Sequence, residues 1–177
     1  MRVYWPTTLA HLAETLGGET LASGPVTVHA VTPTLRDYYA DADPRDLEEE
    51  LEFVAMTDAA GQSLRLLAGE GDAARPRRCV AALEVADGGV LDGPGGRGSW
   101  SAPERSQVVL AGDLRPAQLV SVHVDGEEAE ADVRAALAAL PAADAGDEDA
   151  AFVVENTEGH DLLWYDATEV ALLLLEP

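Results

Sequence analysis

Lysine and isoleucine are absent from the 177-residue sequence, and all 11 of its basic residues are arginines. Without lysine there is neither a Schiff-base nucleophile nor a P-loop lysine, which excludes pyridoxal enzymes and ordinary nucleoside triphosphatases. The single cysteine, Cys79, cannot form an internal disulfide or a thiolate zinc site. This cysteine usage is typical of proteins in a reducing cytosol.

Long hydrophobic runs are also lacking. The longest apolar run covers residues 170–175, which is too short to cross a bilayer. Near the N-terminus, His11 and Glu14 interrupt the stretch that a signal peptide would need to keep apolar. We therefore expect a soluble cytoplasmic protein with no membrane association.

Positive charge is scarce. The chain has 11 arginines and 33 acidic residues, which gives a formal net charge of −22. The imbalance is largest in residues 110–177, which carry 16 acidic residues and two arginines. Such a field repels phosphate backbones, so direct binding to nucleic acid is not expected. The charge favours a basic partner or none, and a homodimer is left open.

Strand and helix patterns alternate along the chain. Period-2 and period-3.6 spacing of apolar residues, with capping and stop signals, predicts strands at 1–5, 26–32, 77–85, 106–111, 120–124 and 160–165, and helices from Thr7 or Thr8 to residue 16 and at 43–68, 114–119, 125–141 and 166–175. Residues 147–156 fit either a helix or a strand, and their acidic start favours a helix. This order predicts one α/β or α+β domain, residues 1–177, with a mixed sheet of about six strands flanked by helices. Residues 86–105 are rich in Gly and Pro without periodicity and are predicted to form a mobile loop.

Two similar tetrapeptides raise the alternative of an internal duplication. Residues 26–29 read V-T-V-H and residues 120–123 read V-S-V-H, and each follows a predicted strand and short helix. A duplication would give two pseudo-symmetric β-α-β-α-β halves, 1–85 and 106–177, joined by the loop. Chance similarity in a valine-rich sequence is the competing explanation.

Histidines and carboxylates supply the only candidate catalytic group. His29, His123 and Asp125 would meet in a site for acid–base or metal chemistry if the two halves paired about a pseudo-twofold axis. The alternative is that each imidazole forms a single hydrogen bond on a half-exposed sheet face. No H-x-H or H-E-x-x-H spacing supports a metal site, so none is assigned.

Aromatic residues occur in adjacent pairs, which suggests binding surfaces. A strand places neighbouring side chains on opposite faces, so one member of a pair can be core while the other is exposed. His160 and Asp161 directly precede the aromatic pair of the predicted strand at 160–165. The candidate binding residues are therefore Tyr4, Trp5, Trp164, Tyr165 and His160.

The sequence contains stretches that resemble cofactor-binding or ion-binding motifs, but the residues in and around them do not fit such sites. Residues 93–98 match G-x-G-x-x-G, but the sequence that follows has neither helical period nor a helix cap, so no nucleotide cofactor is expected. The acidic stretches 41–46 and 144–149 lack the ligand pattern of a calcium-binding loop. Helix first turns and solvated faces account for these acids.

The segments MRVYWPTTL, PTLRDYY, SLRLLA, VHVDGEEAEADVRAAL, DAGDEDAAF and HDLLWYDATEV resemble a family of short, acidic, uncharacterised proteins from high-GC actinobacteria, a domain of unknown function. The resemblance implies a single bacterial cytoplasmic domain, and it carries no activity, cofactor or catalytic residue. The sequence favours a non-enzymatic binding or regulatory module that acts through protein–protein contact. The alternative is a small-molecule or metal-dependent enzyme with a His/carboxylate site.

Overall fold

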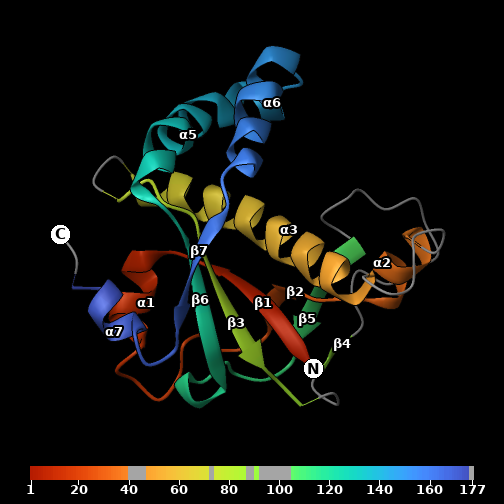
Figure 1. The fold of residues 1–177 in the computed structure, drawn as a ribbon, viewed down its shortest axis with the longest axis vertical. Helices are drawn as coiled ribbons and strands as arrows, with labels where there is room; N and C mark the ends of the chain where they lie inside the picture. Colours follow the sequence, from red (N-terminus) through yellow and green to blue (C-terminus); the bar gives the residue numbers. More distant parts are fainter. Residues whose placement is uncertain (40–46, 72–73, 87–89, 92–104, 176–177) are drawn as a thin grey trace.

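A computed structural model describes the chain except for residues 40–46, 72–73, 87–89, 92–104 and 176–177. The described residues form one α+β domain around a single sheet (Figure 1). The strand order is β4-β5-β2-β1-β3-β6-β7, and every described pair of neighbours is antiparallel. The strands are β1 Arg2–Thr7, β2 Val26–His29, β3 Cys79–Glu84, β4 Val90–Leu91, β5 Gln107–Leu110, β6 Leu119–Asp125 and β7 Leu162–Asp166.

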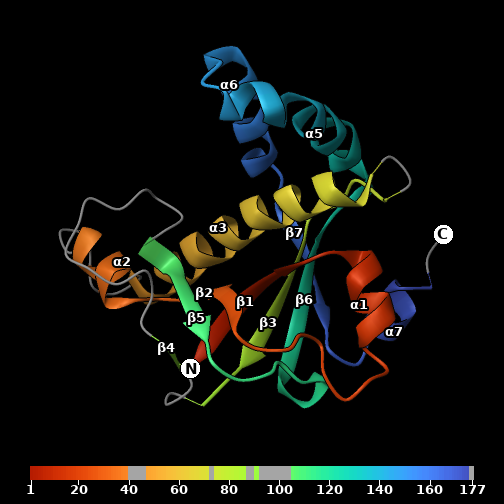
Figure 2. The same ribbon diagram turned by 180° about the vertical axis from the view of Figure 1, so that it is seen from behind.

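Helices cover both faces of the sheet. The long helix α3 crosses one face, and α5 and α6 stack beside the C-terminal half of α3, whereas α1 and α7 cover the other face (Figures 1 and 2). The α-helices are α1 Leu9–Thr15, α2 Pro33–Tyr38, α3 Leu47–Glu70, α5 Glu130–Asp144, α6 Glu148–Glu155 and α7 Val170–Leu173. Short 3-10 turns are η2 Pro116–Gln118, η3 Glu127–Ala129 and η4 Asn156–Gly159.

The period-2 alternation of the central strands separates two cores. On β1, Val3 and Trp5 pack against α1 and α7, while Tyr4 packs against α3. Alanines dominate the contact between α3 and the sheet, where Ala55 and Ala59 are fully buried. These small side chains let the helix lie close to the strands. A third core joins α3 to α5, so the long helix supplies the apolar contact that holds α5 to the rest of the domain.

Local signals located most of the elements. Thr8 accepts a hydrogen bond from the backbone N–H of His11 and caps α1, and Asp147 caps α6 in the same way. Thr32, predicted to end a strand, instead caps α2, a helix that the pattern analysis missed. Gly61 lies inside α3 without interrupting it.

Three local expectations were wrong. Pro6 was expected to end the first strand but lies within β1; on the β2 side only Tyr4 pairs, so the missing N–H of Pro6 costs little there. Pro141 was expected to end its helix but lies inside α5, close to the last turn. Asp125 was expected to cap that helix, but its carboxylate binds Arg78 instead.

The predicted duplication is not confirmed. The two V-[ST]-V-H segments become β2 and β6, but their surroundings in the sheet differ. β1, which would be equivalent to β5, is central between β2 and β3, whereas β5 lies between β4 and β2. Within the predicted loop 86–105, the structure describes β4 paired with β5, and the rest of the loop lies almost entirely outside the described residues.

Two glycines differ sharply in the space around them. At Gly24, an added Cβ would lie 2.7 Å from the carbonyl oxygen of Gly112 and closer still to that of Ala111. At Gly61, within α3, a Cβ would meet nothing within 4 Å. We expect Gly24→Ala to lower the free energy of unfolding by about 1–3 kcal/mol. Gly61→Ala should raise it by about 0.5–1 kcal/mol, because alanine is the better helix former.

Urea unfolding followed by circular dichroism measures both changes. Equal effects of the two substitutions would contradict the close backbone approach at Gly24.

Candidate functional site

The strand β7 forms one edge of the sheet. It pairs with β6, and no strand in the described part of the chain pairs with its outer side. Alternation along β7 places Leu162 and Trp164 on the α3 side and Leu163 and Tyr165 on the other. Trp164 is 59% exposed and Leu163 is 44% exposed, so this edge presents apolar side chains on both of its faces.

An aromatic side chain from α3 extends this apolar edge. Phe53 is 55% exposed and lines a small cleft together with Leu162. The cleft has a volume of about 20 Å³, room for about one water molecule, so it is not a small-molecule site. We call the group of Phe53, Leu162, Leu163 and Trp164 the β7 surface.

Acidic residues surround the β7 surface. Glu158 and Asp161 line the same cleft as Phe53, and Asp166 ends β7. Glu52 directly precedes Phe53 and accepts a hydrogen bond from the hydroxyl of Tyr4 at 3.2 Å. These four acids form what we call the acidic rim. An apolar centre within such a rim has the layout of a protein-binding surface.

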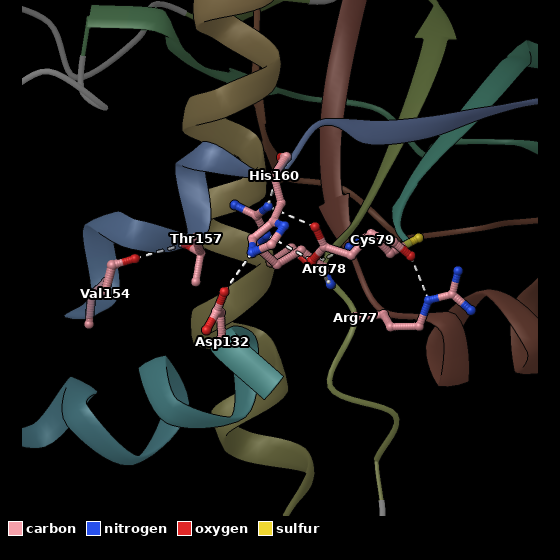
Figure 3. A network of polar contacts seen from close by, with 9 residues as sticks. Arg77, Arg78, Cys79, Asp132, Val154, Thr157 and His160 are labelled. Carbon is pink, nitrogen blue, oxygen red and sulfur yellow. Dashed lines mark hydrogen bonds and ion pairs between the residues drawn. The ribbon is translucent and has the colours of Figure 1, made fainter. Parts of the chain in front are cut away.

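A buried ion pair lies beneath this edge (Figure 3). Arg78 at the start of β3 is 2% exposed, and Asp125 at the end of β6 is fully buried. The pairing is bidentate: Arg78 Nη2 donates to Asp125 Oδ1 at 2.7 Å, and Arg78 Nε donates to Oδ2 at 2.8 Å. The backbone N–H of Arg78 donates to the same carboxylate, and Arg77 Nε donates to the backbone oxygen of Asp125. Every charge of the pair is therefore compensated by hydrogen bonds.

The same arginine reaches the base of β7. Arg78 Nη2 also donates to the backbone oxygen of His160, at 3.3 Å, just before β7 begins. The imidazole of His160 lies with Nε2 2.7 Å from Asp132 Oδ2 on α5, as Figure 3 shows. These contacts join β3, β6, α5 and the entry to β7 at one point. They fix where the edge strand starts.

The predicted binding residues separate into two groups. Tyr4 and Trp5 are 5% and 6% exposed, because β1 is a central strand and helices cover both of its faces. Burial, reinforced by the neighbouring Glu52, raises the pKa of Tyr4. Trp164 is exposed and Tyr165 packs against the core, as expected for neighbours on an edge strand.

The structure does not bring His29, His123 and Asp125 together. β1 and β3 lie between the two histidine-bearing strands, which puts the histidines about 14 Å apart at a spacing of about 4.8 Å per strand. His123 Nε2 lies 3.2 Å from the hydroxyl of Ser121, and burial lowers the pKa of His123. Asp125 is engaged by Arg78.

His29 has partners that the sequence did not indicate. Its Nδ1 lies 2.8 Å from the hydroxyl of Ser106, and that hydroxyl donates to Asp58 Oδ2 at 2.5 Å. Burial lowers the pKa of His29 to about 4 and raises that of Asp58 to about 6. Asp58 belongs to α3 and Ser106 directly precedes β5, so no local spacing connects either residue with His29.

The order of this network differs from that of a catalytic triad. A nucleophilic serine needs the histidine between itself and the acid, whereas here Ser106 stands between His29 and Asp58. Both His29 and Ser106 are fully buried, which closes them to a substrate. The network therefore fastens α3 to β2 and β5 and responds to pH.

The other predicted clusters have structural roles or lie outside the described residues. Asp147 caps α6, and Asp144 pairs with Arg65 at 2.9 Å. Among the residues that the structure describes, no group of three or more His, Cys, Asp or Glu side chains could hold a metal ion. No described helix is long and apolar enough to cross a membrane. The stretches 93–98 and 41–46 lie outside the described residues.

Comparison with known proteins identifies a family. A family model described as a family of unknown function, DUF6912, matches residues 1–174. No curated protein and no solved structure matches the chain significantly.

Breaking the buried ion pair should cost far more than breaking an exposed one. Arg78→Met leaves the carboxylate of Asp125 buried without its charged partner, and we expect a loss of about 3–5 kcal/mol in the free energy of unfolding. Arg65→Met is the matched control, because the Arg65–Asp144 pair is about half exposed and solvent screens it, so its loss should change stability little. Urea unfolding compares the two variants, and similar losses would contradict this account.

Asp58 should make stability depend on pH. Its native pKa of about 6 exceeds the ordinary value of 3.8, so the native state binds more protons than the unfolded state between these values. The contribution of Asp58 to stability is therefore present at low pH and is lost as the pH rises to about 6. In Asp58→Asn the titration is absent, while the amide oxygen can still accept the hydrogen bond from Ser106.

Relative to the wild-type protein, Asp58→Asn should gain about 2 kcal/mol of stability between about pH 4 and about pH 7, after allowance for its partial exposure. Urea unfolding at both pH values measures the gain. The opposite effect of His29, whose low native pKa destabilises the fold in acid, is common to both proteins and cancels in the difference. A difference independent of pH would contradict an elevated pKa at Asp58.

Proposed function

The chain belongs to DUF6912, a family of unknown function, and we propose that it is a non-enzymatic cytoplasmic binding module that holds a basic protein through the β7 surface. The observation that carries this proposal is the exposed Trp164, within a rim of acids, on an edge strand whose outer side pairs with no other described strand. Tryptophan is among the residues that contribute most to protein–protein affinity.

The mode of binding follows from the free edge. An extended segment of the partner adds to β7 by main-chain hydrogen bonds, so that the sheet continues into the partner. Its alternate side chains then face Trp164 on one side and Leu163 on the other. An arginine or lysine over the indole of Trp164 gains a cation–π interaction that a neutral residue lacks.

Charge selects the partner. The acidic rim of Glu52, Glu158, Asp161 and Asp166 surrounds the β7 surface, and the whole chain carries a net charge of −22. A second copy of the chain would bring the same rim and the same charge to the contact, which disfavours a homodimer. A basic segment is attracted both by the acidic rim and by the net charge of the whole chain. Opposite charge also increases the rate of association, and salt weakens this effect.

The contacts around His160 hold the edge strand β7 in the position that binding requires. Arg78, Asp125 and Asp132 hold His160 at the start of β7, so the strand is already in place before a partner arrives. A preorganised strand loses less conformational entropy on binding than a loop.

Site-specific photocrosslinking in cells of the source organism tests the proposal. A benzoylphenylalanine replaces Trp164, and in a matched control it replaces Leu172, an equally accessible residue on α7 that is 69% exposed. We expect a covalent adduct with a basic protein from position 164 and not from position 172. With the purified partner, Trp164→Ala should then weaken binding about 30-fold, since loss of a central aromatic costs about 2 kcal/mol.

Different crosslinking results would contradict different parts of the proposal. Adducts with a second copy of the chain alone would replace the basic partner by a homodimer. The absence of an adduct from position 164, or the same adducts from both positions, would remove the β7 surface as a docking site. Circular dichroism of Trp164→Ala should match the wild-type spectrum, because the side chain is largely exposed.

A further inference from the structure

A second region of the molecule, away from β7, contains a cavity. It lies where β1 ends and β2 begins, between α1 and the last turns of α3, and its volume is about 610 Å³. β1, β3 and β6 separate β2 from the β7 surface. The size is within the usual range for sites that hold small molecules, about 300–1,000 Å³.

The wall is mostly apolar. Trp5 lines the cavity from β1, and Leu66 lines it from α3. The other apolar residues of the wall include Pro6, Pro25 and Val26. Leu66 is 47% exposed, whereas Ser63, Leu64 and Leu67 on the same part of α3 are buried. An apolar body in the cavity would cover it.

The polar part of the wall is selective for charge. Among the described residues that line the cavity, Glu70 is the only one with a formal charge, and none is an arginine. The hydroxyl of Thr8 donates to Oε1 of Glu70, which holds the carboxylate at the cavity wall. A carboxylate accepts several hydrogen bonds, so one donor leaves capacity for a ligand. An anionic ligand would find no counter-charge here.

One further group at the wall fits a ligand that donates a hydrogen bond. His11 Nε2 lies 3.1 Å from the backbone oxygen of Leu21; because a carbonyl only accepts, Nε2 is the donor of this pair, and in that tautomer Nδ1 is an acceptor. Thr7 lines the same wall, but its hydroxyl is fully buried and is not open to the cavity.

We propose that this cavity is a binding site for a protonated amine or guanidinium carried on an apolar body, with Glu70 as its counter-ion. The cation pairs with the carboxylate that Thr8 holds, and the apolar body packs between Trp5 and Leu66. The ligand is either a free small molecule or a basic side chain of a peptide, since both offer this chemistry. The site is independent of the β7 surface.

Nuclear magnetic resonance on the full ¹⁵N-labelled chain tests the proposal with three matched probes. Phenethylamine is the cation, 2-phenylethanol its neutral analogue and phenylacetate its anionic analogue. The indole N–H of Trp5, which lines the cavity, reports on binding there. We expect a saturable shift of the Trp5 signal with phenethylamine, a weaker response to the alcohol and none to phenylacetate.

Two variants assign the charge preference to one carboxylate. Glu70→Gln should weaken phenethylamine binding about tenfold or more, as expected for loss of a hydrogen bond to a charged group. Binding of 2-phenylethanol should be unchanged. Glu49→Gln is the control, because it removes the same charge from the first turn of the same helix, away from the cavity. It should leave both affinities unchanged.

A fourth probe, acetyl-leucyl-arginine amide, distinguishes the two sources of the ligand. Tighter binding of this peptide than of phenethylamine identifies a basic side chain of a peptide, and the reverse identifies a free amine. The proposal is overturned if neither shifts Trp5 at millimolar concentrations, if the three phenyl probes bind equally, or if Glu70→Gln binds the amine as well as the wild-type protein does. None of these results depends on Trp164, so they leave the β7 proposal to its own test.

Discussion

The buried ion pair between Arg78 and Asp125 is the constraint on which the arrangement of the second half of the chain depends. Removing two charges from water is expensive, so such a pair adds little net stability but strongly disfavours any alternative in which either charge is left unpaired. It joins the start of β3 to the end of β6, and Arg78 reaches on to His160 at the entry of β7. A slip of either strand would leave a charge buried alone. The register of β3 and β6, and with them the position of the edge strand, therefore follows from this pair.

The acidic residues have different roles in different parts of the structure. Many acids begin helices or pair with arginines, as Asp147 does at α6 and Glu48 does with Arg36, and these have structural roles. Acids around the β7 surface and at Glu70 differ, because each lies next to apolar side chains that the fold leaves accessible. Carboxylates beside exposed apolar surface favour cations that carry apolar groups. Both proposed sites select for the same chemistry, at a strand edge in one case and in a cavity in the other.

Local patterns predicted the elements where the signal lay within a few residues. Thr8 was expected at the start of the first helix and caps it, and alternation predicted that Trp164 and Tyr165 would have different exposures. Alternation failed for Tyr4 and Trp5, because a central strand is covered on both faces and the sequence does not show which strands are central. The prolines failed for a related reason: whether Pro6 disrupts a strand depends on which partner its nitrogen would have faced.

The sequence by itself determined the net charge, the absence of lysine chemistry, the helix caps at Thr8 and Asp147 and the alternation along each strand, because these depend on composition or on neighbours a few residues apart. Only the tertiary structure decided which polar groups meet. His29 contacts Ser106 and Asp58 rather than His123 and Asp125, and Glu70 is held by Thr8, 62 residues away. These contacts arise from the order of the strands and the path of α3 across them. Long-range packing sets both, and no local spacing of residues records them.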